Sequence, residues 1–342
     1  MSLAMISSYT LPRSQRAVVQ GEKGEPILAS DVPLPPLLEA TVLVKTAGFA
    51  LNTYDYKIGS LQTYPGAIIV NDFVGAIVKI ANDTTTELRV GDVVLGTVHG
   101  SNPSDAHSGA FAEYVRAPAD LLLRVPEGLA IEEAATFGLA LTTSVLRAPV
   151  LVYGASTSTG AMALQLLRLA GFSPIATCSP RNFDLVRTRG AAAVFDYAAP
   201  GTAEQVRLHT GDRLCHTVDC IGDRESVAFC QAAIGRTGGR VARLEVCPGA
   251  LRTRRAVKVE LVMALEVFGK EVALPEPYYR AANQEKHDAE AHFFTVFQRL
   301  LDDGKLKPHP VQLVPGGWIG VLDGLHRLRS GAISGKKLVV LL

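Results

Sequence analysis

Residues 150–171 read VLVYGASTSTGAMALQLLRLAG, and this stretch decides the fold. Its first four residues are an apolar, β-prone run, and apolar residues recur at helical spacing from Ala161 onward. Gly154 and Gly160 bound the turn between the two patterns. A helix that begins directly after such a turn offers backbone N–H groups and the positive end of its dipole to a diphosphate. The stretch therefore predicts the phosphate-binding turn of a dinucleotide site.

The turn departs from the usual glycine pattern at one position. A G-x-x-G-x-x-G spacing has Thr157 where the middle glycine is expected. A strand and a helix joined by small residues also occur in α/β proteins that bind no nucleotide, so this alternative stays open for the turn alone. If the turn does bind phosphate, hydroxyl donors replace bare backbone at Ser156, Thr157, Ser158 and Thr159.

The residues after the next apolar run indicate which dinucleotide is bound. Residues 174–178 lead into Ser179, Pro180, Arg181 and Asn182, without the acidic residue that usually binds the ribose 2′-hydroxyl of NAD. A carboxylate about 4 Å from a 2′-phosphate would cost on the order of 4 kcal/mol, whereas Arg181 would gain a comparable attraction. The pattern predicts NADPH. In the alternative interpretation, Ser179 and Asn182 only cap the following helix.

Charge and composition favour an enzyme without nucleic-acid partners. The chain has 342 residues, 48% of them hydrophobic, which is enough for two moderate cores. Its 34 basic and 33 acidic residues leave a net charge of +1 and no basic footprint typical of nucleic-acid binding. The N-terminus lacks a signal-peptide pattern, and apolar runs are too short to span a membrane. We therefore expect a soluble, cytoplasmic protein.

Cysteine and histidine spacing gives no indication of a metal site. The five cysteines form no C-x-x-C pair, and none lies near His99 or His107 in the sequence. An odd number of scattered cysteines argues against a disulfide framework. Zinc ligation requires Cys and His clusters at short spacing, so we expect no metal.

Hydrophobic periodicity divides the chain into two parts. Residues 16–116 contain short alternating or apolar runs broken by Gly, Pro, Asn and Asp. Strand and helix patterns then alternate between residues 131 and 268, which is typical of a parallel, doubly wound sheet. We predict an α/β fold with a β-rich domain and a doubly wound parallel-sheet domain, whose limits are 1–130 with 268–342 and 131–267. The strands expected in the second domain are 150–153, 175–178, 194–195, 214–218 and 240–244, after a helix at 131–146.

Three segments carry a resemblance to a known superfamily: ALNTYDYKIG (50–59), NDFVGAIV (71–78) and GDVVLGTVHG (91–100). With the order of domains, they resemble the zinc-free quinone and enoyl reductase branch of the medium-chain dehydrogenase/reductase superfamily. The resemblance covers almost the whole chain and implies a GroES-like first domain and a Rossmann second domain. The Gly-His-Glu run of the zinc alcohol dehydrogenases is absent, and Asn71-Asp72-Phe73 lies in its neighbourhood.

A narrower resemblance rests on VLVYGASTSTG (150–160), PIATCSPRNFDLVRTRGA (174–191) and SGKKLVV (334–340). These segments are similar to the stand-alone, trans-acting enoyl reductases that serve fungal polyketide synthases and polyketide–peptide hybrid synthases. The resemblance implies NADPH-dependent reduction of an α,β-unsaturated polyketide thioester in secondary metabolism, in transient contact with the synthase and its acyl carrier domain. That family has a longer loop between Leu146 and Ala148. Either the loop is shortened here, or a stretch is missing from the numbered chain.

The resemblance also implies which residues form the site. Those expected to contact NADPH are Tyr54, Asp55, Tyr56, Lys57, Ser156, Thr157, Ser158, Thr159, Ser179, Pro180, Arg181, Asn182, Tyr197, Leu244, Glu245, Ile333 and Ser334. Those expected to line the substrate are Gly138, Leu139, Ala140, Leu141, Thr142, Thr143, Ser144, Val145, Ala264, Leu265, Glu266, Val267 and Phe268. The second set predicts a largely apolar pocket.

Two of these residues are candidates for catalysis. Conjugate reduction requires orientation and an electrophilic environment for the thioester oxygen more than a strong acid. Lys57 is the leading candidate, because its cationic head would hold the nicotinamide ribose and polarise the site. Tyr54 is the second, as a hydroxyl donor. Asp219 and Glu245 follow expected strands, where they either orient the cofactor or are solvated loop carboxylates.

Other functions remain open from the sequence. One is a free-standing NADPH-dependent reductase of alkenals or quinones, and another is a non-catalytic NADPH-binding protein. We expect a monomer. Its candidate surface for an acidic carrier domain is a short basic run of Arg252, Arg254, Arg255 and Lys258.

Overall fold

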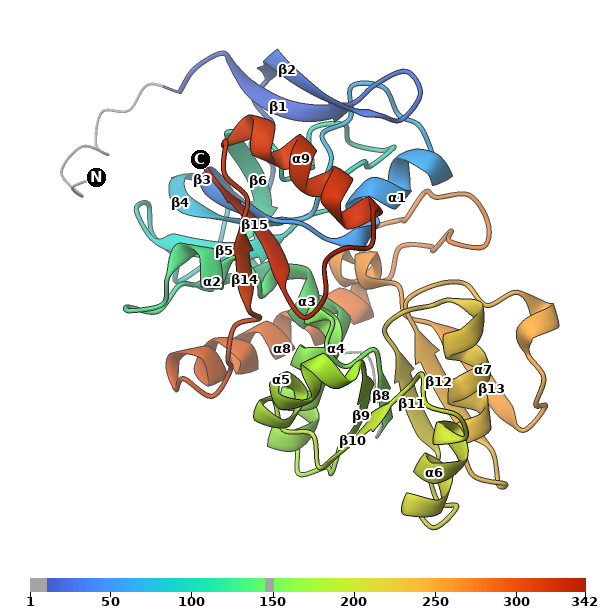
Figure 1. Ribbon diagram of the computed structural model, residues 1–342. Helices are drawn as coiled ribbons and strands as arrows, with labels where there is room; N and C mark the ends of the chain where they lie inside the picture. The colour runs from blue at the N-terminus through green and yellow to red at the C-terminus, as the bar shows by residue number, and fades with distance from the viewer. Residues whose placement is uncertain (1–10, 145–150) are drawn as a thin grey trace. The chain divides into compact units, whose positions relative to one another are not determined.

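The computed structural model describes residues 11–144 and 151–342, which separate into two units (Figure 1). The first unit comprises Met1–Leu139 and Leu265–Leu342, and the second comprises Ala140–Ala264. The join between Leu146 and Ala148, and the first residue of the expected strand at 150–153, lie outside the described residues.

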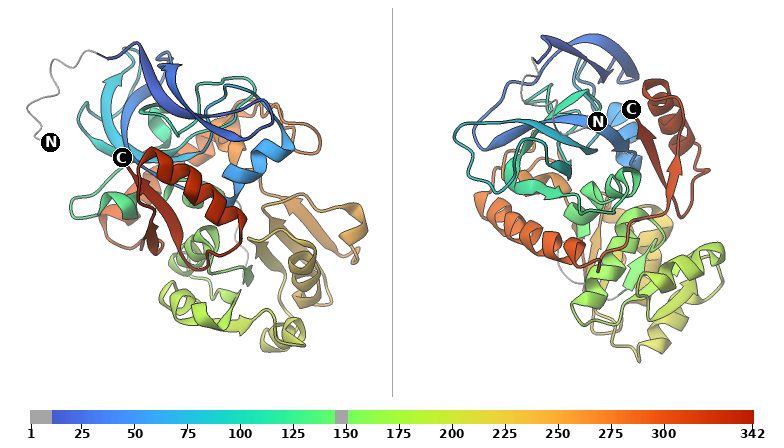
Figure 2. Two further views of the ribbon diagram at one scale, coloured as in Figure 1. Left: turned by 45° about the horizontal axis from the view of Figure 1, so that its top comes forward. Right: turned by 90° about the vertical axis from the view of Figure 1, so that its left-hand side faces the viewer.

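Alternating and apolar runs of the first unit form a seven-stranded sheet in the order β14-β15-β3-β4-β5-β7, with β6 paired to β3. Its strands are β3 (Thr41–Ala50), β4 (Asp72–Ile80), β5 (Val93–Thr97), β6 (Tyr114–Pro118), β7 (Leu122–Arg124), β14 (Val311–Leu313) and β15 (Lys337–Leu341). β1 (Ser14–Gln20) and β2 (Pro26–Pro33) form a separate antiparallel pair. Antiparallel pairing of β15 with β3 brings the C-terminal segment into the sheet of the N-terminal part (Figure 2).

The core of the first unit lies against this sheet. Phe49, Phe73 and Phe111 are fully buried there, and the helix α9 contributes Val321 and Leu325. The helices of the unit are α1 (Thr53–Leu61), α2 (Ile131–Ala134), α8 (Gln284–Asp302) and α9 (Trp318–Arg329), with a short turn η2 (Ala119–Leu121).

The second unit is a six-stranded sheet in the order β10-β9-β8-β11-β12-β13, and each neighbouring pair is parallel. Its strands are β8 (Leu151–Tyr153), β9 (Ile175–Cys178), β10 (Ala193–Asp196), β11 (His216–Asp219), β12 (Gly239–Arg243) and β13 (Val257–Leu261). Its helices are α4 (Ser158–Leu169), α5 (Phe183–Thr188), α6 (Thr202–His209) and α7 (Arg224–Ala233), with η3 (Pro180–Asn182) and η4 (Gly249–Leu251). The strand order reverses between β8 and β11, and ligands of such sheets bind outside the carboxyl ends at that reversal. The predicted doubly wound parallel sheet is confirmed.

The single helix expected at residues 131–146 is wrong. The segment contains α2 and a second helix, α3 (Gly138–Ser144), which begins in the first unit and continues into the second. The break occurs because the Leu139 N–H donates to Asp72 Oδ1 at 2.5 Å, so β4 fixes where α3 begins.

α1 and β13 are two of the elements that were not expected. α1 has little apolar periodicity, and its start depends on a local contact in which the Asn52 N–H donates to the Asp55 carboxylate at 2.6 Å. β13 alternates buried Val257 and Val259 with exposed Lys258 and Glu260, and its charges made it resemble a basic loop.

Candidate active site

The turn after β8 depends on a close approach of backbone at its two glycines. Gly154 has a φ of +74°, a left-handed conformation that favours glycine. A Cβ on Gly160 would lie 2.6 Å from the Gly154 carbonyl oxygen, so α4 begins where the backbones leave no room for a side chain. The first N–H groups of a helix have no helical partners, and here they lie beyond the carboxyl end of β8. This geometry fits a diphosphate.

The Thr157 hydroxyl is already used inside the turn. It accepts from the Gly160 N–H at 3.0 Å, which makes Thr157 the N-cap of α4, and it donates to the Gly154 carbonyl at 2.9 Å. The hydroxyl that replaces the middle glycine is therefore not a spare donor for phosphate, in contrast to its expected role. Nearby, Ser156 Oγ accepts from the Asn182 amide at 3.2 Å, which joins two segments that the sequence assigned to NADPH.

The residues after β9 and β10 present hydroxyls and a cation. Ser179 Oγ and Tyr197 Oη lie 3.4 Å apart, and Arg181 is exposed. Neither Ser179 nor Asn182 makes a side-chain capping hydrogen bond in the described structure, so the capping interpretation of these residues is wrong. A guanidinium and two hydroxyls at this edge fit a 2′-phosphate.

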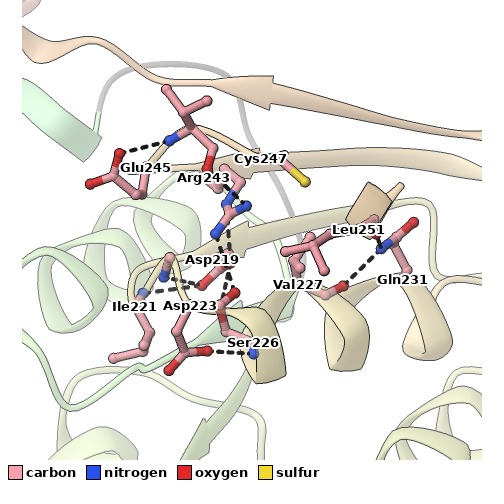
Figure 3. A network of polar contacts seen from close by, with 12 residues as sticks. Asp219, Ile221, Asp223, Ser226, Val227, Gln231, Arg243, Glu245, Cys247 and Leu251 are labelled. Atoms are coloured by element: carbon pink, nitrogen blue, oxygen red, sulfur yellow. Dashed lines mark hydrogen bonds and ion pairs between the residues drawn. The ribbon is translucent and has the colours of Figure 1, made fainter. Parts of the chain in front are cut away.

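A buried ion pair joins the ends of β11 and β12 (Figure 3). Asp219 Oδ2 lies 3.5 Å from Arg243 Nε, and their side chains are 0% and 1% exposed. Asp219 also accepts from the N–H groups of Ile221 and Gly222 at 3.1 and 2.9 Å and from Ser226 Oγ at 2.7 Å. Burial raises the pKa of Asp219, while these donors and Arg243 oppose the rise. Asp219 is therefore not a solvated loop carboxylate, because both of its oxygens accept hydrogen bonds within the second unit.

The loop after β12 contains Leu244 and Glu245, both assigned to NADPH by the sequence. Leu244 packs against the buried cluster beneath α4. The Glu245 carboxylate accepts from the Val246 N–H at 2.9 Å. A Cβ on Gly222 would lie 2.6 Å from the Glu245 Cβ, so this loop and the loop after β11 are in close contact.

In the first unit, α1 carries the expected catalytic residues. The Tyr54 hydroxyl oxygen is buried and has no hydrogen-bond partner among the described residues. Burial raises the pKa of Tyr54, and Asp55 adds to the rise, so the hydroxyl keeps its proton. A buried hydroxyl without a partner is costly unless a ligand or a water completes it. Lys57 is exposed, and Tyr56 packs against the core of the unit.

A buried polar network fixes the start of α1. The Lys337 ammonium donates to Asn52 Oδ1 and to Asp72 Oδ2, both at 2.8 Å. The Asn52 amide donates to Asp72 Oδ2 at 2.9 Å. Burial raises the pKa of Asp55, and the nearby Asp72 adds to the rise, while the Asn52 N–H and Lys337 oppose it. One carboxylate, Asp72, thus connects α1, α3, β4 and β15.

The residues of the two expected substrate segments differ in burial and in their contacts. Ala140 and Leu141 are buried, and a Cβ on Gly138 would overlap the Asp72 carboxylate. The side chains of Thr142, Thr143 and Ser144 and all of Val145 lie outside the described residues. In η5 (Ala264–Phe268), Leu265 and Val267 are buried. Glu266 forms an ion pair with Lys286, so its carboxylate is used within the first unit.

The remaining expected NADPH residues are near the C-terminus. Ile333 packs against the core of the first unit, and Ser334 is half-buried before β15. The structure places them in the same unit as Tyr54.

The basic run expected to meet a carrier domain is not uniform. The Arg254 guanidinium donates to the carbonyls of Gln231 and Ile234 at 2.6 Å and of Gly235 at 2.7 Å. These carbonyls end α7, so the Arg254 guanidinium caps that helix. Arg255 and Lys258 are exposed.

Sequence reasoning missed several residues of these networks, among them Asn52, Asp72, Lys337 and Arg243. Asp72 and Arg243 are charged residues at strand ends, where burial is not visible from periodicity. A signal existed for Asn52, because its spacing to Asp55 is that of an N-cap and its partner. For Lys337 the partner Asp72 is 265 residues away, so the sequence gives no local indication.

Across residues 11–144 and 151–342, no group of three or more His, Cys, Asp or Glu side chains is placed to hold a metal ion. Within the same residues, no helix is long and apolar enough to cross a membrane.

Comparison with known proteins agrees with this architecture. The alcohol dehydrogenase GroES-like domain matches residues 39–127. An alcohol dehydrogenase superfamily protein from Novosphingobium aromaticivorans superposes with a TM-score of 0.75 at 22% identity, over 96% of this chain and 100% of that one. The chain thus contains a GroES-like domain and has the fold of alcohol dehydrogenase superfamily proteins.

Full-length relatives narrow the class. The chain is 40% identical to the trans-enoyl reductase buaC of Petromyces alliaceus, over 97% of this chain and 98% of that protein. It is 44% identical to the trans-enoyl reductase TwmE of Talaromyces wortmannii, over 94% and 96%. The second alignment spans 357 positions, more than the 342 residues here, so TwmE carries residues that this chain lacks. This chain belongs to the trans-enoyl reductase family, as its sequence motifs predicted.

Proposed function

We propose that this chain is a stand-alone, trans-acting enoyl reductase. It uses NADPH to reduce the double bond of an α,β-unsaturated thioester that a polyketide synthase or hybrid synthase carries. The observation that supports this most strongly is the full-length relationship to trans-enoyl reductases at 40–44% identity. The glycine-bounded turn of the second unit supports the dinucleotide part of the proposal.

The reaction has a simple balance. When bound, NADPH would supply a hydride for the β-carbon and be oxidised to NADP⁺; the electrons of the double bond would move to the thioester oxygen, and a proton would then add to the α-carbon. The protein must therefore orient the acceptor and stabilise negative charge on that oxygen.

Tyr54 and Lys57 are proposed to supply this stabilisation. The Tyr54 hydroxyl is buried, keeps its proton and has no partner among the described residues, so it is free to donate to a bound ligand. Lys57 lies one turn along the same helix and adds a positive charge that polarises the site and holds the nicotinamide ribose. A positioning role for Lys57 is preferred to proton donation.

The preference for NADPH is assigned to the edge formed by β9 and β10. Arg181 offers a cation, and Ser179 and Tyr197 offer hydroxyls at 3.4 Å from each other. An arginine recognises a phosphate dianion through charge and paired hydrogen bonds.

Contact with a carrier domain is assigned to Arg255 and Lys258, which are exposed, together with Arg252. Carrier domains are acidic, so these charges favour encounter. The protein is proposed to act as a monomer in the cytoplasm. Reversing the charges of Arg255 and Lys258 is expected to slow reduction of carrier-bound substrate and leave a free thioester unaffected. Equal rates on the carrier-bound substrate would remove this surface from the proposal.

The central test follows deuterium from NADPH labelled at the transferable position. The chain is incubated with an enoyl thioester, and mass spectrometry of the product is expected to show one deuterium at the β-carbon. Binding of NADPH without transfer would indicate a non-catalytic binding protein. Faster turnover of quinones or free alkenals than of the thioester would indicate the rival reductase.

A further inference from the structure

Two loops at the carboxyl edge of the second unit are held by a pair of charges that the proposed reaction does not use. We propose that Asp219 and Arg243 are positioning residues, which hold the loops after β11 and β12 in the shape that receives the nicotinamide half of NADPH. This inference rests on the proposed function, because it takes NADPH as the ligand.

The topology of the sheet assigns the two halves of the cofactor to different strands. The order reverses between β8 and β11, and a dinucleotide lies across this reversal. The residues that fit the 2′-phosphate follow β9 and β10, on one side of β8. The nicotinamide half therefore belongs beyond β11 and β12, on the other side, where Asp219 and Arg243 end their strands.

Each loop is tied to the pair through its backbone (Figure 3). Asp219 accepts from the Ile221 and Gly222 N–H groups of the first loop at 3.1 and 2.9 Å. Arg243 donates to the Asp223 carbonyl of the same loop at 3.3 Å and to the Val246 carbonyl of the second loop at 3.4 Å. The guanidinium thus connects the two loops directly.

The loops are also too close to move independently. Gly222 has a φ of +81°, and a Cβ there would lie 2.6 Å from the Glu245 Cβ. Asp223 in turn caps α7 by accepting from the Ser226 N–H at 2.7 Å. A shift of Arg243 would therefore displace both loops and the start of α7.

Burial of the pair argues for positioning over stability. Both side chains are almost completely withdrawn from water, at 0% and 1% exposure. Desolvation of two charges consumes most of their attraction, so apolar residues of similar size would stabilise the unit as well. What the charges add is a set of directed hydrogen bonds, and all those named above for Arg243 end on loop carbonyls.

Arg254 provides a matched control. It belongs to the same unit and donates to three backbone carbonyls, at the end of α7. It precedes β13, so it lies at the amino-terminal edge of the parallel sheet, opposite to the edge where ligands bind. Loss of Arg254 removes comparable backbone contacts without touching the loops.

The experiment compares two ligands on the full chain by titration calorimetry. NADPH probes the whole site, and adenosine 2′,5′-bisphosphate probes only its adenine half. Arg243→Met is expected to weaken the binding of NADPH about tenfold or more. The affinity for the bisphosphate is expected to change by less than about twofold. Arg254→Met is expected to lower the melting temperature and leave both affinities unchanged. Arg243→Lys, which keeps the buried charge, is expected to recover part of the NADPH affinity.

Asp219→Asn keeps the size of the side chain and serves for the same comparison if Arg243→Met does not fold. Unchanged NADPH affinity in the folded variant would overturn the inference. An equal loss for both ligands would also overturn it, because that pattern indicates general destabilisation. A wild-type chain that binds neither ligand would overturn the proposed function, and the inference with it.

Discussion

Lys337 carries a positive charge into the interior of the first unit, where Asp72 and the Asn52 amide surround it. Lys337→Met would leave the Asp72 carboxylate buried without a counter-charge. We expect the free energy of unfolding to fall by about 3–5 kcal/mol, measured by urea denaturation. The neighbouring Lys336 is exposed, so Lys336→Met is expected to change the free energy of unfolding by less than about 0.5 kcal/mol. Equal effects of the two substitutions would contradict the network.

Arg181 carries the expected discrimination between the two cofactors. Because Arg181 is exposed, water and salt partly screen its attraction to a 2′-phosphate. Arg181→Ala is therefore expected to lower the affinity for NADPH about tenfold. NADH affinity is expected to stay the same, since NADH lacks the phosphate. Arg187→Ala is the control, because Arg187 is paired with Asp184 at 3.2 Å on α5. A parallel loss of NADH affinity would assign Arg181 a structural role.

Single residues show where sequence reasoning reaches its limit. The glycines of the turn at 154–160 were predictable, since backbone approach requires them wherever a helix follows such a turn. The use of the Thr157 hydroxyl was not, because a hydroxyl serves equally as a cap or as a phosphate donor until its neighbours are known. The same holds for Asp219, whose partner Arg243 is in another strand.

At the scale of elements, α8 carries a carboxyl group on its buried face. Glu290, Phe294, Phe297 and Leu301 form this face, and Glu290 Oε2 has no partner in the described structure. Burial raises the pKa of Glu290 from 4.5 to about 7. The folded state therefore binds a proton more tightly than the unfolded state. The stability from this proton is present below pH 4.5 and is lost as the pH rises through 7.

Glu290→Gln is accordingly expected to stabilise the protein only at higher pH. At pH 8 the free energy of unfolding should rise by about 1–2 kcal/mol, a value reduced from the full shift because Gln also leaves a polar atom buried. Near pH 4 the variant and the wild type should be equal. Denaturation curves at both pH values provide the measurement, with the exposed Glu285→Gln as control. A gain that is the same at both pH values would contradict the titration.

Elements were predicted well where one pattern extends over the whole element. β9 occurs where the apolar run placed it, at Ile175–Cys178. The helix expected at 131–146 failed because its interruption depends on a hydrogen bond from Leu139 to Asp72, 67 residues away. Hydrophobic spacing does not record contacts of that range.

For the whole molecule, the stretch at 150–171 and the change of period along the chain were enough to predict the α/β class and the doubly wound sheet. Each strand of a parallel sheet requires a crossover, and that alternation is visible in sequence. The buried networks of the two units were not predictable, because each joins residues from strands that meet only after folding.

Residues 54–57 of the first unit are proposed to contact NADPH, and the single tryptophan of the chain allows this to be tested. In the first unit, the ring centroids of Trp318 and Phe49 lie 5.8 Å apart, so Trp318 fluorescence reports unfolding of that unit. Circular dichroism reports unfolding of both units. At about 100 times its Kd, NADPH adds about 2.7 kcal/mol to any unit that it binds. We expect NADPH to raise the melting temperature in both signals, because Tyr54 and Lys57 are in the first unit.

Adenosine 2′,5′-bisphosphate is the control, since it reaches only the proposed adenine half in the second unit. The bisphosphate is expected to raise the melting temperature measured by circular dichroism and to leave the melting temperature measured by Trp318 fluorescence unchanged. If NADPH does not move the Trp318 transition, residues 54–57 do not hold the cofactor. If the bisphosphate moves it as far as NADPH does, the two units unfold together, and the shift no longer supports a contact at Tyr54 or Lys57.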